Sequence, residues 1–151
     1  MDKIFQLDID PVGKGRPRVT SFGGRPRMYT PAKTRSFENA IGRVASRHLE
    51  KIDGPLRVDI LAITTRPKRL KRKKDSDKVI YRTTKPDADN VRKAVLDGLS
   101  PFFDDKQVVS GETFSLYSEK EGKGRVVIRV TLSIGDPVEE VGKIFQGYLS
   151  S

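Results

Sequence analysis

The chain has 151 residues, a length typical of one domain with its own buried core. Lys and Arg outnumber Asp and Glu by 30 to 20, and the resulting formal charge of +10 predicts a polyanionic partner. Because the chain has no cysteine and a single histidine, disulfides, zinc fingers, thiol catalysis and His-rich metal sites are excluded. No apolar run approaches the ~20 residues of a membrane span, and the acidic N-terminus lacks the pattern of a signal peptide. We therefore expect a cytoplasmic protein with no membrane partner, in which any metal is held by oxygen ligands.

Hydrophobic periodicity and turn residues predict these elements in chain order: a strand over 3–9, a hairpin over 20–29, a helix over 34–49, strands over 56–65 and 78–84, a helix over 89–99, and strands over 107–117 and 125–134. Gly23-Gly24 marks the turn of the hairpin. Thr34 or Ser36 is the expected cap of the first helix, and Asp89 or Asn90 begins the second.

This order of strands and helices indicates an α+β fold, in which one domain contains a mixed β-sheet and two main helices. No internal repeat and no change in composition marks a second globular domain. We expect the domain to occupy 1–135 and a C-terminal tail to follow over 136–151. Apolar residues recur in this tail at near-helical spacing, which predicts a helix that needs its own core or a partner subunit to cover it. Gly142 and Gly147 weaken that helix prediction.

Positive charge is concentrated in two short stretches. Residues 11–35 contain no acid, and their cations alternate with Gly and Pro, which suits turns that bring amides and guanidinium groups to phosphates. The second stretch, RPKRLKRKK at 66–74, is either a solvated loop or a further contact to nucleic acid. The residues that we expect to contact nucleic acid are Lys14, Arg16, Arg18, Arg25, Arg27, Lys33, Arg69, Lys71 and Arg72.

Acidic residues gather between 85 and 111, in KPDADNVRKAVLDGLSPFFDDKQVVSG. Asp87 and Asp89 directly follow a predicted strand. Because side chains at i and i+2 of an extended backbone point to the same side, both carboxylates are expected to converge. Lys93 and Asp97 follow at four-residue intervals, which places them on one helical stripe with Asp89. The return of the chain after the helix is expected to bring Asp104-Asp105 to the same place.

Converging carboxylates are the ligands that Mg²⁺ prefers in proteins. The cation would activate a water and neutralise charge on a phosphodiester under attack, and Lys93 would stabilise the same charge. A calcium-binding EF-hand is excluded, because Arg92 and Gly98 occupy the positions of its required Gly and Glu. The other interpretation is structural: Asp87 and Asp89 cap a helix, while Lys93 and Asp97 form surface ion pairs. The Asp-x-Asp motif alone favours this structural interpretation. Its combination with Asp104-Asp105 and two basic stretches favours a metal site that acts on a phosphodiester.

The run KPDADNVRKAVLDGL followed by DDKQVV resembles the RusA family of Holliday junction resolvases, whose motif is Asp-x-Asp-Asn-x-x-Lys-x-x-x-Asp and then Asp-Asp-x-x-Val. The stretches GKGRPRVT and MYTPAKTRSFE are also similar to the N-terminal part of phage-type and Gram-positive members. The resemblance covers about residues 11–50 and 80–133. It implies a small α+β protein that acts as a homodimer and introduces paired nicks across a four-way junction, with Mg²⁺, or Mn²⁺ as its substitute.

Taken position by position, the resemblance implies that Asp87, Asp89 and Asp105 bind the metal and that Lys93 is catalytic. Asp105 matches the family's third acid better than Asp104 does. The remaining polar positions of the motif, Asn90, Asp97 and Asp104, take supporting places. This chain departs from the enterobacterial type in a shorter interval before Asp-Asp, in the basic 66–74 insertion and in the tail after Ile134.

The leading hypothesis is therefore a Mg²⁺-dependent endodeoxyribonuclease, bacterial or phage-encoded, that resolves Holliday junctions in DNA recombination and repair. Two alternatives stay open: a non-catalytic basic protein that binds nucleic acid, and a nuclease for other branched DNA such as flaps and forks. His48 is expected to be a surface residue near the end of a helix.

Overall fold

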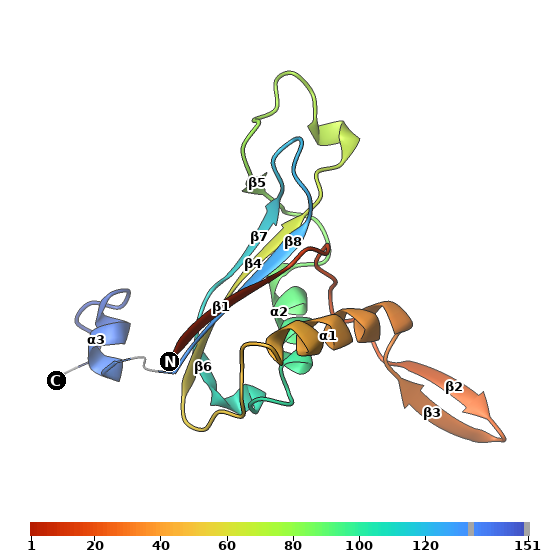
Figure 1. Cartoon of the computed structure of the whole chain (residues 1–151), viewed down its shortest axis with the longest axis horizontal. Coiled ribbons are helices and arrows are strands. Elements are labelled where there is room, and N and C mark those ends of the chain that lie inside the picture. Colours follow the sequence, from red (N-terminus) through yellow and green to blue (C-terminus); the bar gives the residue numbers. More distant parts are fainter. Residues whose placement is uncertain (133–134, 150–151) are drawn as a thin grey trace.

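The computed structural model describes residues 1–132 and 135–149 and confirms the α+β class (Figure 1). The strands are β1 (Asp2–Leu7), β2 (Arg18–Phe22), β3 (Arg25–Tyr29), β4 (Leu56–Thr64), β5 (Ile80–Tyr81), β6 (Val108–Ser110), β7 (Thr113–Tyr117) and β8 (Arg125–Thr131). The helices are α1 (Ala32–Ala45), α2 (Ala88–Gly98) and α3 (Pro137–Gly142), with short 3-10 turns at Lys68–Leu70 and Asp105–Gln107. Within the described residues, no helix combines the length and the apolar character that crossing a bilayer requires.

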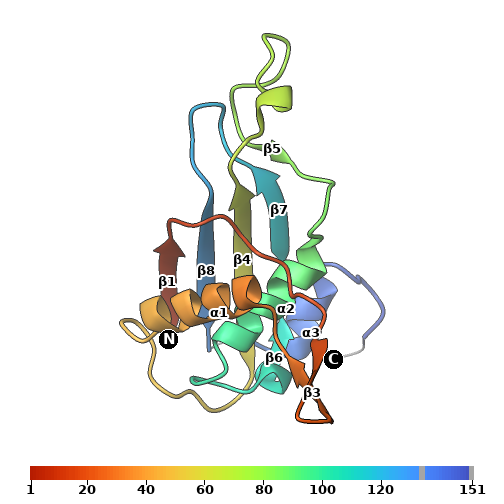
Figure 2. The ribbon, with the colours of Figure 1, turned by 90° about the vertical axis from the view of Figure 1, so that its right-hand side faces the viewer.

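One mixed sheet forms the body, with the strand order β1-β8-β4-β7-β5 and β6 paired to β4. β4 runs parallel to β6 and β7, whereas the other pairs of this sheet are antiparallel. Alternation along β4 sends Leu56, Val58, Ile60 and Ala62 into the core and turns Leu61 to the opposite face. Both main helices lie on the same face of the sheet (Figure 2), so neither of them covers the opposite face.

The two main helices pack on each other as well as on the sheet. Their buried stripes recur at the spacing of a helix and are formed by Phe37, Ile41 and Ala45 of α1 and by Val91, Ala94 and Val95 of α2. Gly98 allows the close approach, because a Cβ at this position would lie 2.9 Å from the carbonyl oxygen of Glu38. The end of α2 is therefore fixed against α1.

The start of α1 was predicted wrongly. The helix begins at Ala32 after Pro31, which makes no side-chain cap, and neither Thr34 nor Ser36 is the cap. Thr34 lies instead within the first turn of the helix and is buried. Its hydroxyl accepts a hydrogen bond from the Gly15 amide at 3.1 Å and donates to the Gly13 carbonyl at 3.3 Å. The side chain expected to cap a helix thus holds the N-terminal basic segment.

Two predicted strands are shorter than expected. The strand over 107–117 is divided at Gly111, which separates β6 from β7. Its φ of 135° is one that glycine adopts readily and other residues rarely do. The strand over 78–84 is reduced to the two residues of β5, because the chain leaves the sheet edge after Tyr81 and turns towards α2. β8 ends at Thr131, and residues 133–134 of the predicted strand lie outside the described residues.

The tail contains a helix of six residues, α3, rather than a helix along its whole length. Asp136 caps it, and the helix ends at Gly142, as the low helix propensity of glycine suggests. The apolar residues that follow are exposed: Ile144, Phe145, Tyr148 and Leu149. The tail lies apart from the body, on the side of the sheet opposite α1 and α2 (Figure 1).

Candidate active site

The start of α2 holds the first pair of predicted site residues. Asp87 is the N-cap, and its Oδ1 accepts a hydrogen bond from the Asn90 amide at 2.9 Å. Asp89 lies in the first turn of the helix and is exposed. The structural interpretation is confirmed for Asp87 as a helix cap, whereas Asp89 or Asn90 as the cap was wrong. The prediction of an extended i, i+2 pair was also wrong, because the helix begins at Ala88. The two carboxylates are neighbours on a helix end instead.

Lys93 follows Asp89 by one helical turn and is exposed. The opposite face of α2 is buried in the core, so the helix is held by one side and presents Asp89 and Lys93 to solvent on the other. Among the described residues Lys93 makes no salt bridge, and the predicted surface pairing of Lys93 with Asp97 is not formed. Its ammonium is therefore available to an anion.

Asp97 forms its salt bridge with Lys14 and not with Lys93, although Lys93 is only four residues from it in the sequence. The Lys14 ammonium lies 2.8 Å from Asp97 and 2.7 Å from Glu38, and the Lys14 amide donates to the Asn90 carbonyl at 3.0 Å. Partial burial, the largest influence, lowers the pKa of Lys14, but the hydrogen bonds that Lys14 donates to Asp97 and Glu38 outweigh it and raise that pKa above the ordinary 10.5. The residue expected to contact DNA is thus occupied in joining the N-terminal segment to α1 and α2.

The segment around Lys14 packs directly on the peptide that precedes Asp87. A Cβ at Gly13 would lie 2.5 Å from Cβ of Pro86, so only glycine allows this contact. Between the two segments lies a cavity of about 430 Å³, whose charged and amide-bearing walls are Lys14, Arg16, Lys33, Lys85, Asp87 and Asn90. Four cations from positions 14 to 85 therefore share the walls of one cavity with Asp87.

Asp104 and Asp105 lie beyond the other end of α2. Asp104 caps a 3-10 turn by accepting from the Lys106 amide at 3.1 Å, and the Gln107 side chain accepts from the Asp104 amide at 2.8 Å. The same Gln107 side chain donates to the carbonyls of Ile52 and Gly54, which fixes the turn to the loop before β4. The Lys106 amide, its strongest influence, holds the pKa of Asp104 below the usual value. Asp104 is therefore a structural cap, although it is exposed as Asp105 is.

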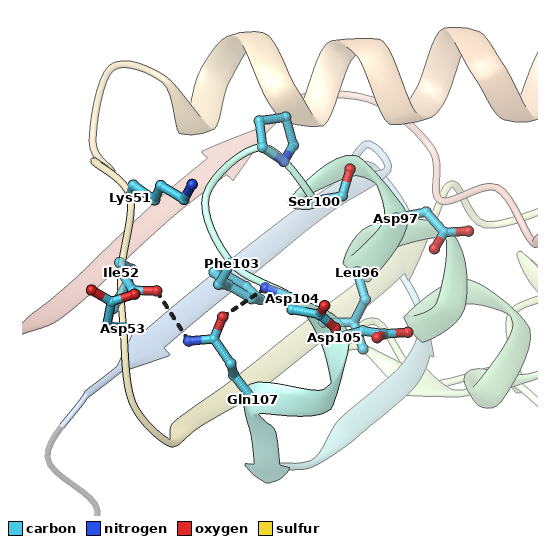
Figure 3. A pocket seen from close by; sticks show the side chains of 11 residues that line it. Lys51, Ile52, Asp53, Leu96, Asp97, Ser100, Phe103, Asp104, Asp105 and Gln107 are labelled. Atoms are coloured by element: carbon cyan, nitrogen blue, oxygen red, sulfur yellow. Dashed lines mark hydrogen bonds between the residues drawn. The ribbon is translucent and has the colours of Figure 1, made fainter.

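A second cavity, of about 480 Å³, lies beside this turn (Figure 3). Asp97, Asp104 and Asp105 line it together with Lys51 and Asp53. It lies beyond the C-terminal end of α2, whereas Asp87 lines the cavity at the N-terminal end. Because α2 has eleven residues and is therefore about 16 Å long, these two cavities lie at opposite ends of a helix of that length.

The three predicted metal ligands are consequently not assembled in one copy of the chain. Across residues 1–132 and 135–149, no group of three or more His, Cys, Asp or Glu side chains is placed to hold a metal ion. Asp87 and Asp89 nevertheless fit a hard cation, because Mg²⁺ is commonly held by one or two carboxylates while phosphate oxygens and waters complete its shell. The Oδ2 atom of Asp87 is left over from capping and Asp89 is exposed, so both have oxygens to offer. The donor set fits a metal bound jointly with substrate phosphate.

Sequence reasoning missed Arg82, which fixes the approach to Asp87. Its guanidinium donates to the carbonyls of Lys85 and Pro86, and lies 5.5 Å from the centre of the Tyr117 ring. The Tyr117 hydroxyl in turn lies 2.8 Å from Thr84 Oγ1. A single arginine among thirty cations carries no signal of this role, which depends on a fold that brings β7 beside residues 82–86.

Arg92 was missed as well. It is half buried under β4 and β7, and it donates to the Val58 carbonyl at 3.0 Å and to Thr113 Oγ1 at 3.1 Å. Burial, the largest influence, lowers its pKa, and Asp59 and Asp89 oppose that shift. In the sequence, Arg92 served only to exclude an EF-hand.

The basic stretch 66–74 divides into a structural part and an exposed part. Arg66 is buried, and its guanidinium donates to the carbonyls of Leu70, Ser76, Lys78 and Ser118. Arg72 bonds to Asp75, and Arg69 approaches the Tyr117 hydroxyl at 3.4 Å. Lys71 is exposed. The stretch is therefore an ordered loop that is closed by its first cation.

The other expected DNA contacts lie around the hairpin of β2 and β3. Arg16 precedes it, Arg18, Arg25 and Arg27 belong to it, and Lys33 follows in the first turn of α1; all are exposed. His48 is exposed near the end of α1, as predicted, and stacks on Phe5 with 5.3 Å between ring centres.

Comparison with known proteins agrees with the motif at α2. The family model described as Endodeoxyribonuclease RusA matches residues 8–131, which is most of the chain. A protein of Bacillus subtilis (strain 168) described as "Uncharacterized protein YqaN" is 38% identical over 139 residues, covering 85% of this chain and 97% of that protein. The matched region includes both ends of α2, the cavity around Asp87 and the Asp104-Asp105 turn. The chain belongs to the RusA family of endodeoxyribonucleases.

Proposed function

We propose that the chain cuts four-way DNA junctions and that it works with Mg²⁺, or Mn²⁺, held at the start of α2. Its family consists of endodeoxyribonucleases, which hydrolyse phosphodiester bonds. The observation that carries the proposal is the fixed position of Asp87 as the N-cap of α2, with Asp89 in the first turn and cations on the walls of the adjoining cavity. A carboxylate pair among cations suits a bridge from protein to phosphate through a divalent ion.

Asp87 and Asp89 would hold the cation, and a bound cation supplies neutralisation of the charge that grows on the phosphoryl oxygens. Lys93, one turn further along the exposed stripe, would stabilise the same charge from the protein side. Arg16, Lys33 and Lys85 around the cavity would bind the flanking phosphates. Asp105 is assigned a ligand role only in the DNA-bound assembly, because in the isolated chain it lines the cavity beyond the C-terminal end of α2.

We also propose that two copies act together, because paired nicks in a two-fold junction need two sites at a fixed spacing. The face of the sheet that α1 and α2 leave uncovered supports self-association. It carries the exposed apolar side chains of Ile4, Leu61 and Phe114, and beside them the ion pairs Arg57–Asp59 and Asp2–Arg129. A surface with apolar side chains beside charged groups has the composition of a protein interface. Sedimentation at micromolar concentration should give twice the chain mass, and Leu61→Glu should halve it; a parent that sediments as one chain would contradict this part of the proposal.

The function is tested by incubating the protein with labelled four-way, flap and linear duplex DNA, with and without Mg²⁺. We expect symmetrical nicks in the four-way DNA that require the metal. Asp89→Asn should remove cleavage while retaining or improving binding, because a negative charge near DNA is lost. Asp8→Asn, the same change at an exposed site after β1, is the matched control and should cut as the parent does.

Each of the other outcomes would indicate a different function for this chain. Preferential cutting of flaps indicates a nuclease for other branched DNA. Binding without cleavage by the parent, in Mg²⁺ and in Mn²⁺, indicates a non-catalytic binding protein. Equal cutting by the parent and by Asp89→Asn would refute the assignment of the site.

A further inference from the structure

The β2–β3 hairpin contributes nothing to the core of the protein. It pairs only with itself and projects from the body beside the start of α1 (Figure 1). Every residue of β3 is exposed. A lone two-stranded ribbon is marginally stable in water, so packing gives no reason for its sequence.

The register of the ribbon separates its side chains by charge. Directly opposite residues of an antiparallel pair lie on the same face, and the faces alternate along each strand. Arg18 pairs with Tyr29 and Thr20 pairs with Arg27, while Arg25 lies two residues from Arg27 along β3. Arg18, Arg25 and Arg27 therefore share one face with Tyr29. The other face carries Val19, Ser21, Pro26 and Met28, which have no charge.

These arginines form a row with a regular spacing. Alternate residues of a strand are about 7 Å apart, and diagonal neighbours across a pair are about as far. Among the described residues none of the three makes a salt bridge, whereas Lys14, Arg57, Arg72, Arg125 and Arg129 all do. Like charges held side by side repel each other, and a polyanion along the row removes that repulsion.

The base of the ribbon leads into the cavity that Asp87 lines. Arg16, two residues before Arg18, and Lys33, four residues after Tyr29, both belong to the walls of that cavity. The cationic row thus runs from the hairpin turn to the proposed cleavage site.

We propose that the hairpin is a DNA-binding arm, whose arginine face holds the backbone of one duplex arm and leads its strand to the start of α2. The choice of DNA as the ligand rests on the proposed function. The neutral face of Val19 and Met28 points away from that backbone.

The test is the salt dependence of binding to a labelled four-way junction, measured by fluorescence anisotropy in EDTA so that no cleavage occurs. Each phosphate contact contributes about 0.9 to the slope of log K against log salt. Arg18→Gln/Arg25→Gln/Arg27→Gln should therefore lower the slope by about 2.7 and weaken binding on the order of 100-fold at 0.1 M salt. Each single substitution should lower the slope by about 0.9.

Two control variants decide between explanations. Lys3→Gln/Arg43→Gln/Arg47→Gln removes the same three charges from exposed positions in β1 and around the C-terminal end of α1, and should change the slope far less. Val19→Thr/Met28→Gln alters the neutral face and should bind as the parent does. If this first control variant loses as much slope as the hairpin variant, net charge alone explains binding and the proposal is overturned. If the neutral-face variant loses as much affinity as the arginine variant, the arginine face is not the contact.

Because these binding measurements need no catalysis, the proposal of a DNA-binding arm and the proposal of nuclease activity can be refuted separately. Loss of slope in a protein that never cuts DNA supports the arm and refutes the nuclease. An unchanged slope in a protein that cuts four-way DNA refutes the arm alone.

Discussion

Asp87 has two separable roles, because one of its oxygens caps α2 and the other is proposed to bind the metal. Asp87→Ser keeps an oxygen that can accept from the Asn90 amide at the N-cap, but it removes the carboxylate. Asp87→Ala removes both. Comparison of the two variants divides the stability of the helix from the chemistry of the site.

The magnitudes follow from the single cap hydrogen bond of 2.9 Å. Replacing an N-cap Asp with Ala costs about 1 kcal/mol, whereas Ser is among the preferred caps and should cost a few tenths at most. For a chain of this size 1 kcal/mol lowers the melting temperature by about 2–4 °C. Cleavage of four-way DNA should fall by at least about 100-fold in both variants, because both lack the charged ligand.

The assays are thermal unfolding followed by circular dichroism, and single-turnover cleavage with saturating protein. We expect the Ser variant to melt with the parent and yet to be as inactive as the Ala variant. A Ser variant that cuts at the parental rate would refute the reasoning, since Asp87 would then be only a helix cap. Equal melting of all three proteins would refute the capping argument and leave the metal role intact.

Three further predictions concern residues that shape the site. Lys14→Met should destabilise the protein by about 1–3 kcal/mol at pH 7, because two carboxylates lose their shared cation. The raised pKa of Lys14 means that its contribution to the free energy of unfolding is complete below pH 10.5 and is lost above the pKa of the folded state. Urea unfolding should therefore show the stabilities of the parent and the variant converging in strong alkali. Arg66→Met leaves several loop carbonyls without their donor and should cost about 2 kcal/mol, with faster tryptic cleavage within 67–79 while cleavage elsewhere is unchanged. Gly111→Ala would place a Cβ 1.8 Å from the Val58 carbonyl at a φ of 135° and should cost several kcal/mol, whereas Gly142→Ala, which meets nothing within 4 Å, should be neutral or stabilising; equal melting temperatures for the two variants would contradict this.

Much of the fold was predictable because its elements have strong local patterns. Alternation along 56–64 and the apolar stripes of α1 and α2 appear in the sequence as they appear in the core. The glycine pair at 23–24 predicts the hairpin turn directly, and both glycines have positive φ. The division of one strand at Gly111 was not predictable, because it depends on the distant Val58 carbonyl.

The candidate site was predictable in its residue types but not in its geometry. The Asp-x-Asp-Asn pattern located the start of α2, yet the pattern cannot tell an extended pair of carboxylates from a cap followed by a first-turn residue. The partner of Asp97 was likewise hidden, since Lys14 reaches it from 83 positions away in the sequence, while Lys93 is only four residues from it. Long-range ion pairs of this kind leave no periodic signal.

Anomalous scattering from Mn²⁺, in crystals of the protein bound to four-way DNA, locates the metal ion directly and so tests whether Asp87 and Asp89 are its ligands. The account predicts a manganese peak within coordination distance of both carboxylates and of a DNA phosphate. A peak confined to the cavity lined by Asp97, Asp104 and Asp105, with none at the start of α2, would contradict it.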